Sequence, residues 1–254
     1  MRAYILAGLM GCLTLLAGTA ELLYRDGGII RGPADQRMIA LVFTGHEFGE
    51  SGEIILQQLS RHGAHASFFL TGDFLRNPDF TKLVRNIAKG GHYLGPHSDK
   101  HLLYCSWETD KKTLITRDEF RRDLEGNLAA LERFGVKRNH VRYWLPAYEW
   151  YNPDIARWSA ELNLQLINYT AGTKSNADYT EESEKAFVSS EAILKSILDK
   201  ERSDPNGLNG FILLLHIGAG PGRKDKMHEQ LGGLLDALAA KKYRFVRVDE
   251  LLRQ

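Results

Sequence analysis

Apolar runs alternate with amphipathic stretches along the chain from residue 38 onward. A short run rich in branched and aromatic residues predicts a buried strand, and apolar residues that recur every three or four positions predict a helix packed against it. Residues 38–43 form the first such run, and residues 53–62 form the first amphipathic stretch, which Gly63 ends. Six more strands are predicted at residues 66–70, 92–95, 141–145, 165–169, 211–216 and 243–248. The remaining helices are predicted near residues 80–88, 116–134, 153–162, 190–200 and 227–241.

This order of elements indicates the fold class. Strands separated by helices at intervals of roughly 25 to 45 residues pair in parallel, because each helix carries the chain back along the sheet. Such units in a chain of 254 residues predict an α/β fold, namely a TIM-like barrel in a single domain. An open doubly wound sheet is the alternative. Because no repeat or linker divides the chain, the predicted domain covers residues 38–254, after a polar lead at residues 21–37.

Residues 1–20 have the layout of a secretory signal peptide. Met1 and Arg2 precede an apolar stretch that ends in small residues before Glu21. An uncleaved membrane anchor is the alternative, and Cys12 lies in a segment that resembles a lipoprotein acylation site. We therefore expect an exported protein, periplasmic or associated with the cell envelope, with membrane contact only through this segment.

Composition and charge exclude several classes of protein. The chain has 33 Lys and Arg against 32 Asp and Glu, a net charge of +1, and it contains no basic run. A nucleic acid is therefore not an expected partner. With 43% hydrophobic and 10% aromatic residues, the chain is globular rather than disordered. Beyond residue 20 the single cysteine is Cys105, so stability must come from the apolar core.

Polar residues gather where predicted strands end, which in either fold is the edge that binds ligands. His97 and His101 are spaced i, i+4, so both imidazoles can reach one divalent ion, although such pairs are often surface histidines. His46 and Glu47 follow the first strand at the same edge. Three protein ligands with an open fourth position define a catalytic zinc site, and His46, His97 and His101 would supply it. Glu47 is then a candidate base or a ligand, or it is a solvated loop residue.

Four segments in order resemble the polysaccharide deacetylases of the NodB-homology type, which form carbohydrate esterase family 4. ASFFLTG at residues 66–72 resembles the family's ATFFxxG, and GHYLGPHSDKH at residues 91–101 resembles its metal motif GHEIGNHSxxH. LLLH at residues 213–216 resembles LxLH, and residues 238–251 resemble the closing LxxKGYxFVxLxEL. The resemblance runs from about Met38 to the end of the chain.

The resemblance implies a distorted (β/α)7 barrel and a metal-dependent hydrolase that removes N- or O-acetyl groups from sugar polymers. His97 and His101 would be metal ligands, and His216 would be the acid that protonates the leaving amine. Asp178 would orient His216, unless it is an ordinary loop aspartate. The expected cofactor is one divalent ion, and the imidazole-rich ligands favour zinc. The expected partner is an acetylated poly- or oligosaccharide.

Two motifs depart from the family. Its TFDDG motif supplies a base aspartate and a metal aspartate, but this chain has FTGHE at residues 43–47, so the usual base is absent in either register. Its RPPYG motif becomes LPAYE at residues 145–149, which loses the arginine and keeps the tyrosine. These losses indicate either a rearranged active site or a carbohydrate-binding protein without turnover. A metal hydrolase of a non-carbohydrate amide or ester is a third hypothesis.

Aromatic residues near the second of these motifs suggest a place for the sugar. Tyr148 is a candidate contact to the acyl oxygen or the sugar. Trp144 and Trp150, with Tyr151, are candidates for a stacking groove, or they belong to the core.

Overall fold

The computed structural model describes residues 21–253. The predicted signal peptide or anchor, residues 1–20, lies outside the described residues. Within residues 21–253, no helix is both long enough and apolar enough to span a bilayer.

The strand β3 (Met38–Gly45) is the centre of the main sheet. One edge of β3 pairs with β8 (Phe211–His216) over most of its length. The other edge pairs first with β9 (Arg244–Val246) and then with β4 (Ser67–Leu70). Beyond β4 lies β5 (Tyr93–Pro96), and every one of these pairs is parallel. Parallel pairing is what the alternation of strands and helices predicted.

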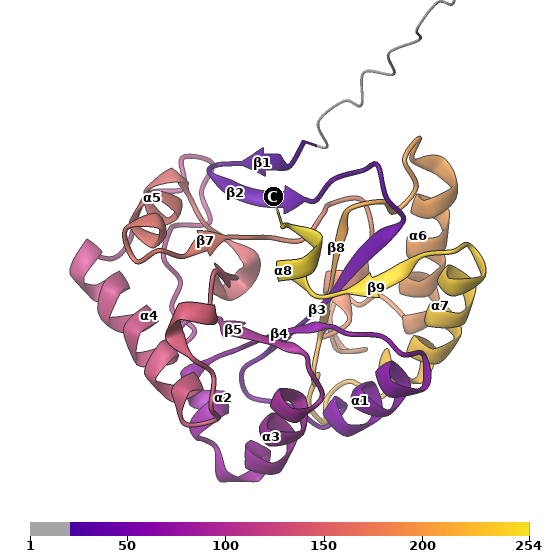
Figure 1. Ribbon diagram of the computed structural model, residues 1–254, viewed down its shortest axis with the longest axis horizontal. Coiled ribbons are helices and arrows are strands. Elements are labelled where there is room, and N and C mark those ends of the chain that lie inside the picture. Colours follow the sequence, from indigo (N-terminus) through magenta and orange to yellow (C-terminus); the bar gives the residue numbers. More distant parts are fainter. Residues whose placement is uncertain (1–20, 254) are drawn as a thin grey trace, which may run out of the picture.

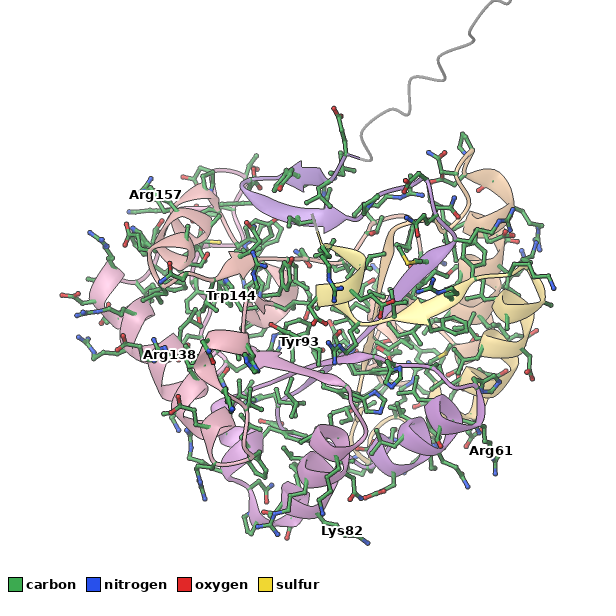
Figure 2. The ribbon with its side chains drawn as sticks, viewed as in Figure 1. Arg61, Lys82, Tyr93, Arg138, Trp144 and Arg157 are labelled. Carbon is green, nitrogen blue, oxygen red and sulfur yellow. The ribbon has the colours of Figure 1, made fainter. Side chains whose placement is uncertain are left out.

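A second, shorter parallel pair continues the ring beyond β5. It consists of β6 (Tyr143–Trp144) and β7 (Gln165–Leu166). The backbone N–H of Leu145 donates to the carbonyl of Pro96 over 3.2 Å. The buried hydroxyl of Tyr93 accepts from the N–H of the first residue of β6 at 2.8 Å and donates to its carbonyl at 2.9 Å. Figure 2 shows Tyr93 at the centre of the molecule, where this side chain substitutes for part of the missing strand ladder.

The ring closes on its other side through equally sparse contacts. The N–H of Thr170 donates to the carbonyl of Ile212 in β8 over 3.0 Å. In addition, β2 (Gly28–Arg31) forms an isolated parallel β-bridge with the segment after β7, between Ile29 and Ile167. Strands β3 to β9 therefore form the distorted (β/α)7 barrel that was expected, and its irregular side runs from β5 through β6 and β7 to β8.

Helices cover the outside of the barrel (Figure 1). The predicted helices are confirmed as α1 (Gly52–Arg61), α3 (Thr81–Lys89), α4 (Arg117–Glu132), α5 (Pro153–Glu161), α6 (Ser190–Ser203) and α7 (His228–Ala240). The sequence pattern missed two short helices, α2 (Gly72–Arg76) and α8 (Val248–Leu251). Both are too short to show a helical period in the sequence.

The polar lead is part of the folded body. Its β1 (Leu23–Arg25) is exposed, but it forms an antiparallel hairpin with β2, whose first three residues are buried. Arg31 pairs with Asp204 over 3.1 Å and also donates to two backbone carbonyls beyond α6. Residues 21–37, which were predicted to precede the domain, therefore pack against the barrel.

Alternate residues of β3 face two different cores, because successive side chains of a strand point to opposite faces. Ile39, Leu41 and Phe43 pack against the surrounding helices, whereas Ala40 and Val42 point into the barrel. All five are at most 1% exposed, and β8 alternates in the same way. Burial on both faces explains why these strands are uninterrupted apolar runs in the sequence.

The same alternation decides which residues reach the carboxyl end of the barrel. Thr44 follows the inward face and pairs in register with His216. Gly45 follows the outward face, where a Cβ atom would lie 2.6 Å from Ile217. A side chain at residue 45 would therefore collide with the core, so a carboxylate cannot occupy that position without rearrangement.

Asn127 in α4 fixes two neighbouring strand ends. It is fully buried; its Oδ1 accepts from the N–H of His97 at 2.7 Å, and its Nδ2 donates to the carbonyl of Leu70 at 3.0 Å. The side chain thus holds the end of β4 against the segment that carries the predicted metal ligands.

Replacing Asn127 with Leu tests this clamp. Asn127→Leu keeps the volume but leaves a buried N–H and a buried carbonyl without a partner, and each such group costs about 1–3 kcal/mol. Urea denaturation should therefore show a loss of that order in the free energy of unfolding, while the exposed Asn139→Leu changes it little. Equal stabilities for the two variants would contradict the clamp.

Candidate functional site

An open pocket of about 510 Å³ lies at the carboxyl ends of the barrel strands. Its walls come from the segments that follow β3, β5, β6, β7 and β8, as the fold class predicts. Seven of the predicted site residues line this pocket: His46, Glu47, His97, His101, Tyr148, Trp150 and His216. Asp178 lies directly behind His216, and Trp144 is elsewhere.

His216 and Asp178 form a hydrogen-bonded pair at the end of β8, in which the side chain of Asp178 is 3% exposed and that of His216 is 19% exposed. The Nδ1 atom of His216 lies 2.6 Å from one carboxylate oxygen of Asp178, and the backbone N–H of His216 donates to the other at 2.9 Å. Burial alone would lower the pKa of His216, but the charge of Asp178 and its hydrogen bond outweigh burial and raise it. Asp178 thereby favours the imidazolium form, which can act as a proton donor.

The loop that carries Asp178 is held by Arg223, which sequence reasoning did not identify. This guanidinium is fully buried, and it donates to the carbonyls of Thr180 at 2.7 Å and Val188 at 2.9 Å. A longer contact of 3.4 Å reaches the carbonyl of Ala177. Since these carbonyls flank Asp178 on both sides, Arg223 fixes the position of the carboxylate behind His216.

His97 is prepared to bind through its outer ring nitrogen. It is buried, and its Nδ1 atom lies 2.9 Å from the carbonyl of Leu145, so Nδ1 carries the proton and Nε2 keeps a free lone pair. Burial lowers the pKa of His97 well below the usual value and lowers that of His101 to about 3. Both imidazoles are therefore neutral at physiological pH, which is the form that binds a metal ion.

The three predicted ligands lie together, but they are not arranged as a finished metal site. The rings of His46 and His101 stack with centroids 4.4 Å apart and planes 9° apart, and the rings of His97 and His101 are 5.3 Å apart. Within residues 21–253, no three His, Cys, Asp or Glu side chains are placed to hold a metal ion as they stand. As donors, three clustered imidazoles suit a divalent ion such as zinc. The stacked rings would have to turn so that their lone pairs converge.

Two residues after β3 differ in how they meet the pocket. The hydroxyl of Thr44 is buried and has no hydrogen-bond partner among residues 21–253, which marks a place where a ligand or water completes the site. Glu47, the predicted base, is exposed and forms no hydrogen bond or ion pair within the same part of the chain. The structure gives Glu47 no partner that would orient it, so its role as a base stays a prediction.

Glu149 is a pocket residue that the sequence interpretation left without a role. Burial raises its pKa to about 7, while the nearby charge of His216 lowers it and that of Asp178 raises it. Its backbone has a φ of 52°, and that of Tyr148 has a φ of 61°, so two consecutive residues adopt the left-handed conformation. That conformation costs roughly 1–2 kcal/mol for a residue with a Cβ atom. The sequence contained one signal for Glu149, namely a non-glycine residue at the position where the family's RPPYG motif has glycine.

Exposed aromatic rings form one wall of the pocket. Tyr148 is 45% exposed and lies against His101, with ring centroids 4.3 Å apart. Trp107, which is 59% exposed and was not predicted, packs 5.6 Å from Tyr148 and 5.5 Å from Trp150. Large exposed aromatic faces beside a polar pocket are suited to stacking on sugar rings.

The prediction that Trp144 lines the groove is wrong. Trp144 is fully buried in the core beneath α4 and α5, among Tyr104 and Phe120 (Figure 2). Tyr151 is buried as well, at 3% exposure. Both belong to the apolar core, which was the alternative interpretation of these aromatic residues.

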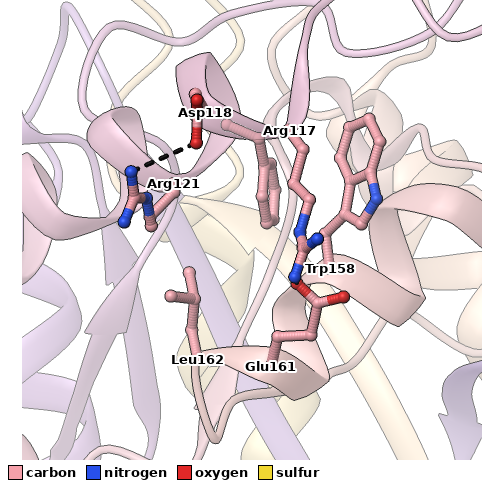
Figure 3. Close-up of a pocket in the computed structure, with 7 residues that line it drawn as sticks. Arg117, Asp118, Arg121, Trp158, Glu161 and Leu162 are labelled. Carbon is pink, nitrogen blue, oxygen red and sulfur yellow. Dashed lines mark hydrogen bonds and ion pairs between the residues drawn. The ribbon is translucent and has the colours of Figure 1, made fainter.

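A second pocket, of about 290 Å³, lies between α4 and α5 (Figure 3). Arg117 and Glu161 form an ion pair across it, and Arg121 pairs with Asp118 at its edge. Exposed ion pairs of this kind contribute little to stability. The pocket contains no histidine, cysteine or hydroxyl side chain, and we assign it no chemistry.

Comparison with known proteins identifies the family. The profile of the polysaccharide deacetylase family matches residues 31–167, and the chain belongs to this family. A peptidoglycan-N-acetylglucosamine deacetylase of Bacillus cereus is 24% identical over 223 residues, which cover 87% of this chain and 70% of that protein. An uncharacterized 30.6 kDa protein of Geobacillus stearothermophilus is 35% identical over 107 residues, and the chain spans only 36% of its length.

Solved structures share the fold. A crystal structure of a peptidoglycan N-acetylglucosamine deacetylase has a TM-score of 0.71 at 23% identity, covering 89% of this chain and 92% of the other. The wild-type structure of a carbohydrate esterase family 4 pseudoenzyme from Bacillus anthracis has a TM-score of 0.69 at 19% identity, covering 90% of this chain and 70% of the other. The barrel is therefore shared with a named deacetylase and with a named pseudoenzyme.

The pair formed by His216 and Asp178 makes a direct prediction. In Asp178→Asn the carboxylate charge is lost while the amide fills the same space, so the imidazolium form loses its stabilising partner. The pKa of His216, followed by NMR titration of the ring protons, should fall below the wild-type value. Asp154→Asn, on a surface helix, should leave it unchanged. An unaltered pKa in Asp178→Asn would show that the carboxylate does not control His216.

Proposed function

We propose that this chain is a metal-dependent deacetylase that hydrolyses acetyl groups on an N- or O-acetylated carbohydrate. The observation that carries the proposal is the hydrogen-bonded pair of His216 and Asp178 facing a pocket that also holds three imidazoles. Membership of the polysaccharide deacetylase family supports the substrate class. The names of the relatives support an acetylated amino sugar as the first substrate to try.

In this proposal His46, His97 and His101 hold one divalent ion, for which zinc suits the nitrogen ligands. When bound there, such an ion supplies Lewis acidity to the acetyl carbonyl and lowers the pKa of a water molecule. The carbonyl of Leu145 keeps the proton of His97 on Nδ1 and thereby presents Nε2 to the ion. Tyr148, Trp150 and the added Trp107 form the wall against which a sugar ring stacks.

His216 serves the departing group. Its Nδ1 proton is held by Asp178, so the proton that His216 can give away is the one on Nε2, toward the pocket. A raised pKa keeps the imidazolium populated until the carbon–nitrogen bond breaks. Protonation of the leaving amine then prevents the tetrahedral intermediate from returning to substrate.

A second candidate is a carbohydrate-binding protein without turnover. It is favoured by the absence of a carboxylate at Thr44 and Gly45, and by the pseudoenzyme among the structural neighbours. The retained pair of His216 and Asp178 argues against it, because a binding module needs no proton donor. We further propose that the protein is exported to the periplasm or cell envelope, a proposal that rests on the composition of residues 1–20.

Metal binding is tested with paired histidine variants. Wild type should bind one divalent ion, and the double variant His97→Ala with His101→Ala should lose it, because two of three nitrogen ligands are gone. Elemental analysis and competition titration with a chromophoric chelator measure the stoichiometry and affinity. The matched control is His65→Ala with His140→Ala, two exposed histidines outside the pocket. Stoichiometric metal in the pocket variant would refute the site.

Turnover is tested at His216. His216→Ala should lower kcat for acetate release by about 10²–10⁴-fold, the range typical of a lost general acid, and should leave the metal bound. His228→Ala, outside the pocket, should match wild type. If wild type binds an acetylated oligosaccharide without releasing acetate, and His216→Ala binds it equally well, the chain is the binding protein.

A further inference from the structure

The pocket lacks a carboxylate where its family carries the base. At the end of β3, Thr44 supplies a hydroxyl, and Gly45 faces a core that has no room for a side chain. The next carboxylate along the chain, Glu47, is exposed and makes no hydrogen bond or ion pair with any residue of the described part. Neither the end of β3 nor the segment that follows it therefore supplies a carboxylate held in place by a partner.

Glu149 is placed by an unusual backbone at the end of β6. Tyr148 and Glu149 have φ angles of 61° and 52°, a conformation that glycine adopts freely and that strains residues with a Cβ atom. The surrounding structure enforces it, because Asn168 donates to the carbonyl of Glu149 at 2.7 Å and the N–H of Glu149 donates to Pro146 at 3.0 Å. The related motif quoted above has glycine at this position.

Such strain is retained where the side chain has a use. Glycine would fit here with no backbone penalty, yet this chain has a glutamate, which lines the pocket and is influenced by the charge of His216. The strained residue thus points to a role in the pocket's chemistry, rather than to a role in the turn.

The electrostatic surroundings of Glu149 suit a base. Burial raises its pKa to about 7, so ionised and neutral forms coexist near neutral pH. The groups that face it are His216 from β8 and Asp178 from the loop behind that strand, together with Tyr169 and Tyr179, whose own pKa values are raised in part by the charge of Glu149. A carboxyl group with a pKa near 7 beside an imidazolium is the arrangement expected for a general base and a general acid with distinct roles.

We propose that Glu149 is the general base of this site, standing in for the carboxylate that the end of β3 has lost. The proposal rests on the deacetylase function proposed above. The carboxylate of Glu149 takes one proton from the attacking water as the water oxygen bonds to the acetyl carbon, and the carbonyl π electrons move to the carbonyl oxygen. The oxyanion then re-forms the carbonyl, the carbon–nitrogen bond breaks, and the nitrogen takes its proton from His216. The products are acetic acid and the amine, and loss of the proton from Glu149 together with reprotonation of His216 restores the resting state.

The first experiment compares two carboxylates of one pocket. Glu149→Gln keeps the size and the hydrogen-bonding shape but cannot accept a proton, so kcat for acetate release from an N-acetylated chito-oligosaccharide should fall about 10²–10⁴-fold. Affinity for the oligosaccharide, measured by calorimetry, should stay at the wild-type value. The same substitution at Glu47 tests the rival base, and with Glu149 as the base Glu47→Gln should lose far less kcat than Glu149→Gln. The matched control is Glu132→Gln, at the exposed end of α4 and outside the pocket, which should retain wild-type kcat and affinity.

The second experiment separates a base from a structural role. Glu149→Gly removes the carboxylate and leaves a cavity at a backbone position where glycine is unstrained, so its melting temperature should be no lower than that of Glu149→Gln. Added formate should enter the cavity, accept the proton and raise the kcat of Glu149→Gly, while leaving Glu149→Gln unchanged. Absence of rescue would count against a base at this position.

The outcomes distinguish this proposal from the one on which it rests. If wild type releases acetate and Glu149→Gln matches it, Glu149 is not the base while the deacetylase function stands. If Glu47→Gln loses activity instead, the base is Glu47. If wild type releases no acetate from any N- or O-acetylated oligosaccharide, the deacetylase function is wrong and the base role of Glu149 fails with it.

Discussion

The burial of both faces of β3 is the constraint on which the site depends. The side chains of β3 alternate between the helical shell and the barrel interior, and this alternation fixes the direction in which the last residues of the strand point. Thr44 continues the inward face beside His216, while Gly45 continues the outward face and meets Ile217. The packing of an apolar strand thus decides which atoms the pocket receives at its floor. A single shift in register would bring Gly45 inward and remove Thr44 from the site.

Much of this arrangement could be predicted from the sequence. The apolar runs predicted strands at the positions of β3 to β9, most clearly for β3 and β8, which are buried on both faces and are therefore apolar along their length. The histidines of the pocket were also predictable, since residues that follow parallel strands meet at one edge. Trp144 and Trp107 could not be told apart by composition: one is packed beneath α4, and the other reaches the pocket on a loop. Glu149 was signalled only by a non-glycine residue where the family's motif has glycine, and its strained backbone became visible only in the structure. Arg223 was missed because its role depends on burial, which no local pattern reveals.

The pocket lacks a carboxylate at the end of β3 and has an additional one at the end of β6. At the end of β3 this chain has the hydroxyl of Thr44 where the family has acidic residues. At the end of β6 it has the carboxylate of Glu149 where the family has glycine. The charge of His216 lowers the pKa of Glu149 and so favours its carboxylate form, and the same His216 donates a proton in the proposed mechanism. In our proposal the base moves from the end of β3 to the end of β6 within the same barrel. Such a move explains how a family can keep its fold while its motifs drift apart.

The central claim is that this pocket hydrolyses acetyl groups with the help of a metal ion. The most direct measurement is acetate release from an N-acetylated oligosaccharide, followed by proton NMR for one preparation in three states: as purified, stripped with chelator, and reloaded with zinc. We expect multiple turnovers as purified or after reloading, and none after stripping. A protein that stays folded, takes up zinc and binds the oligosaccharide, yet produces no acetate in any state, would contradict the claim.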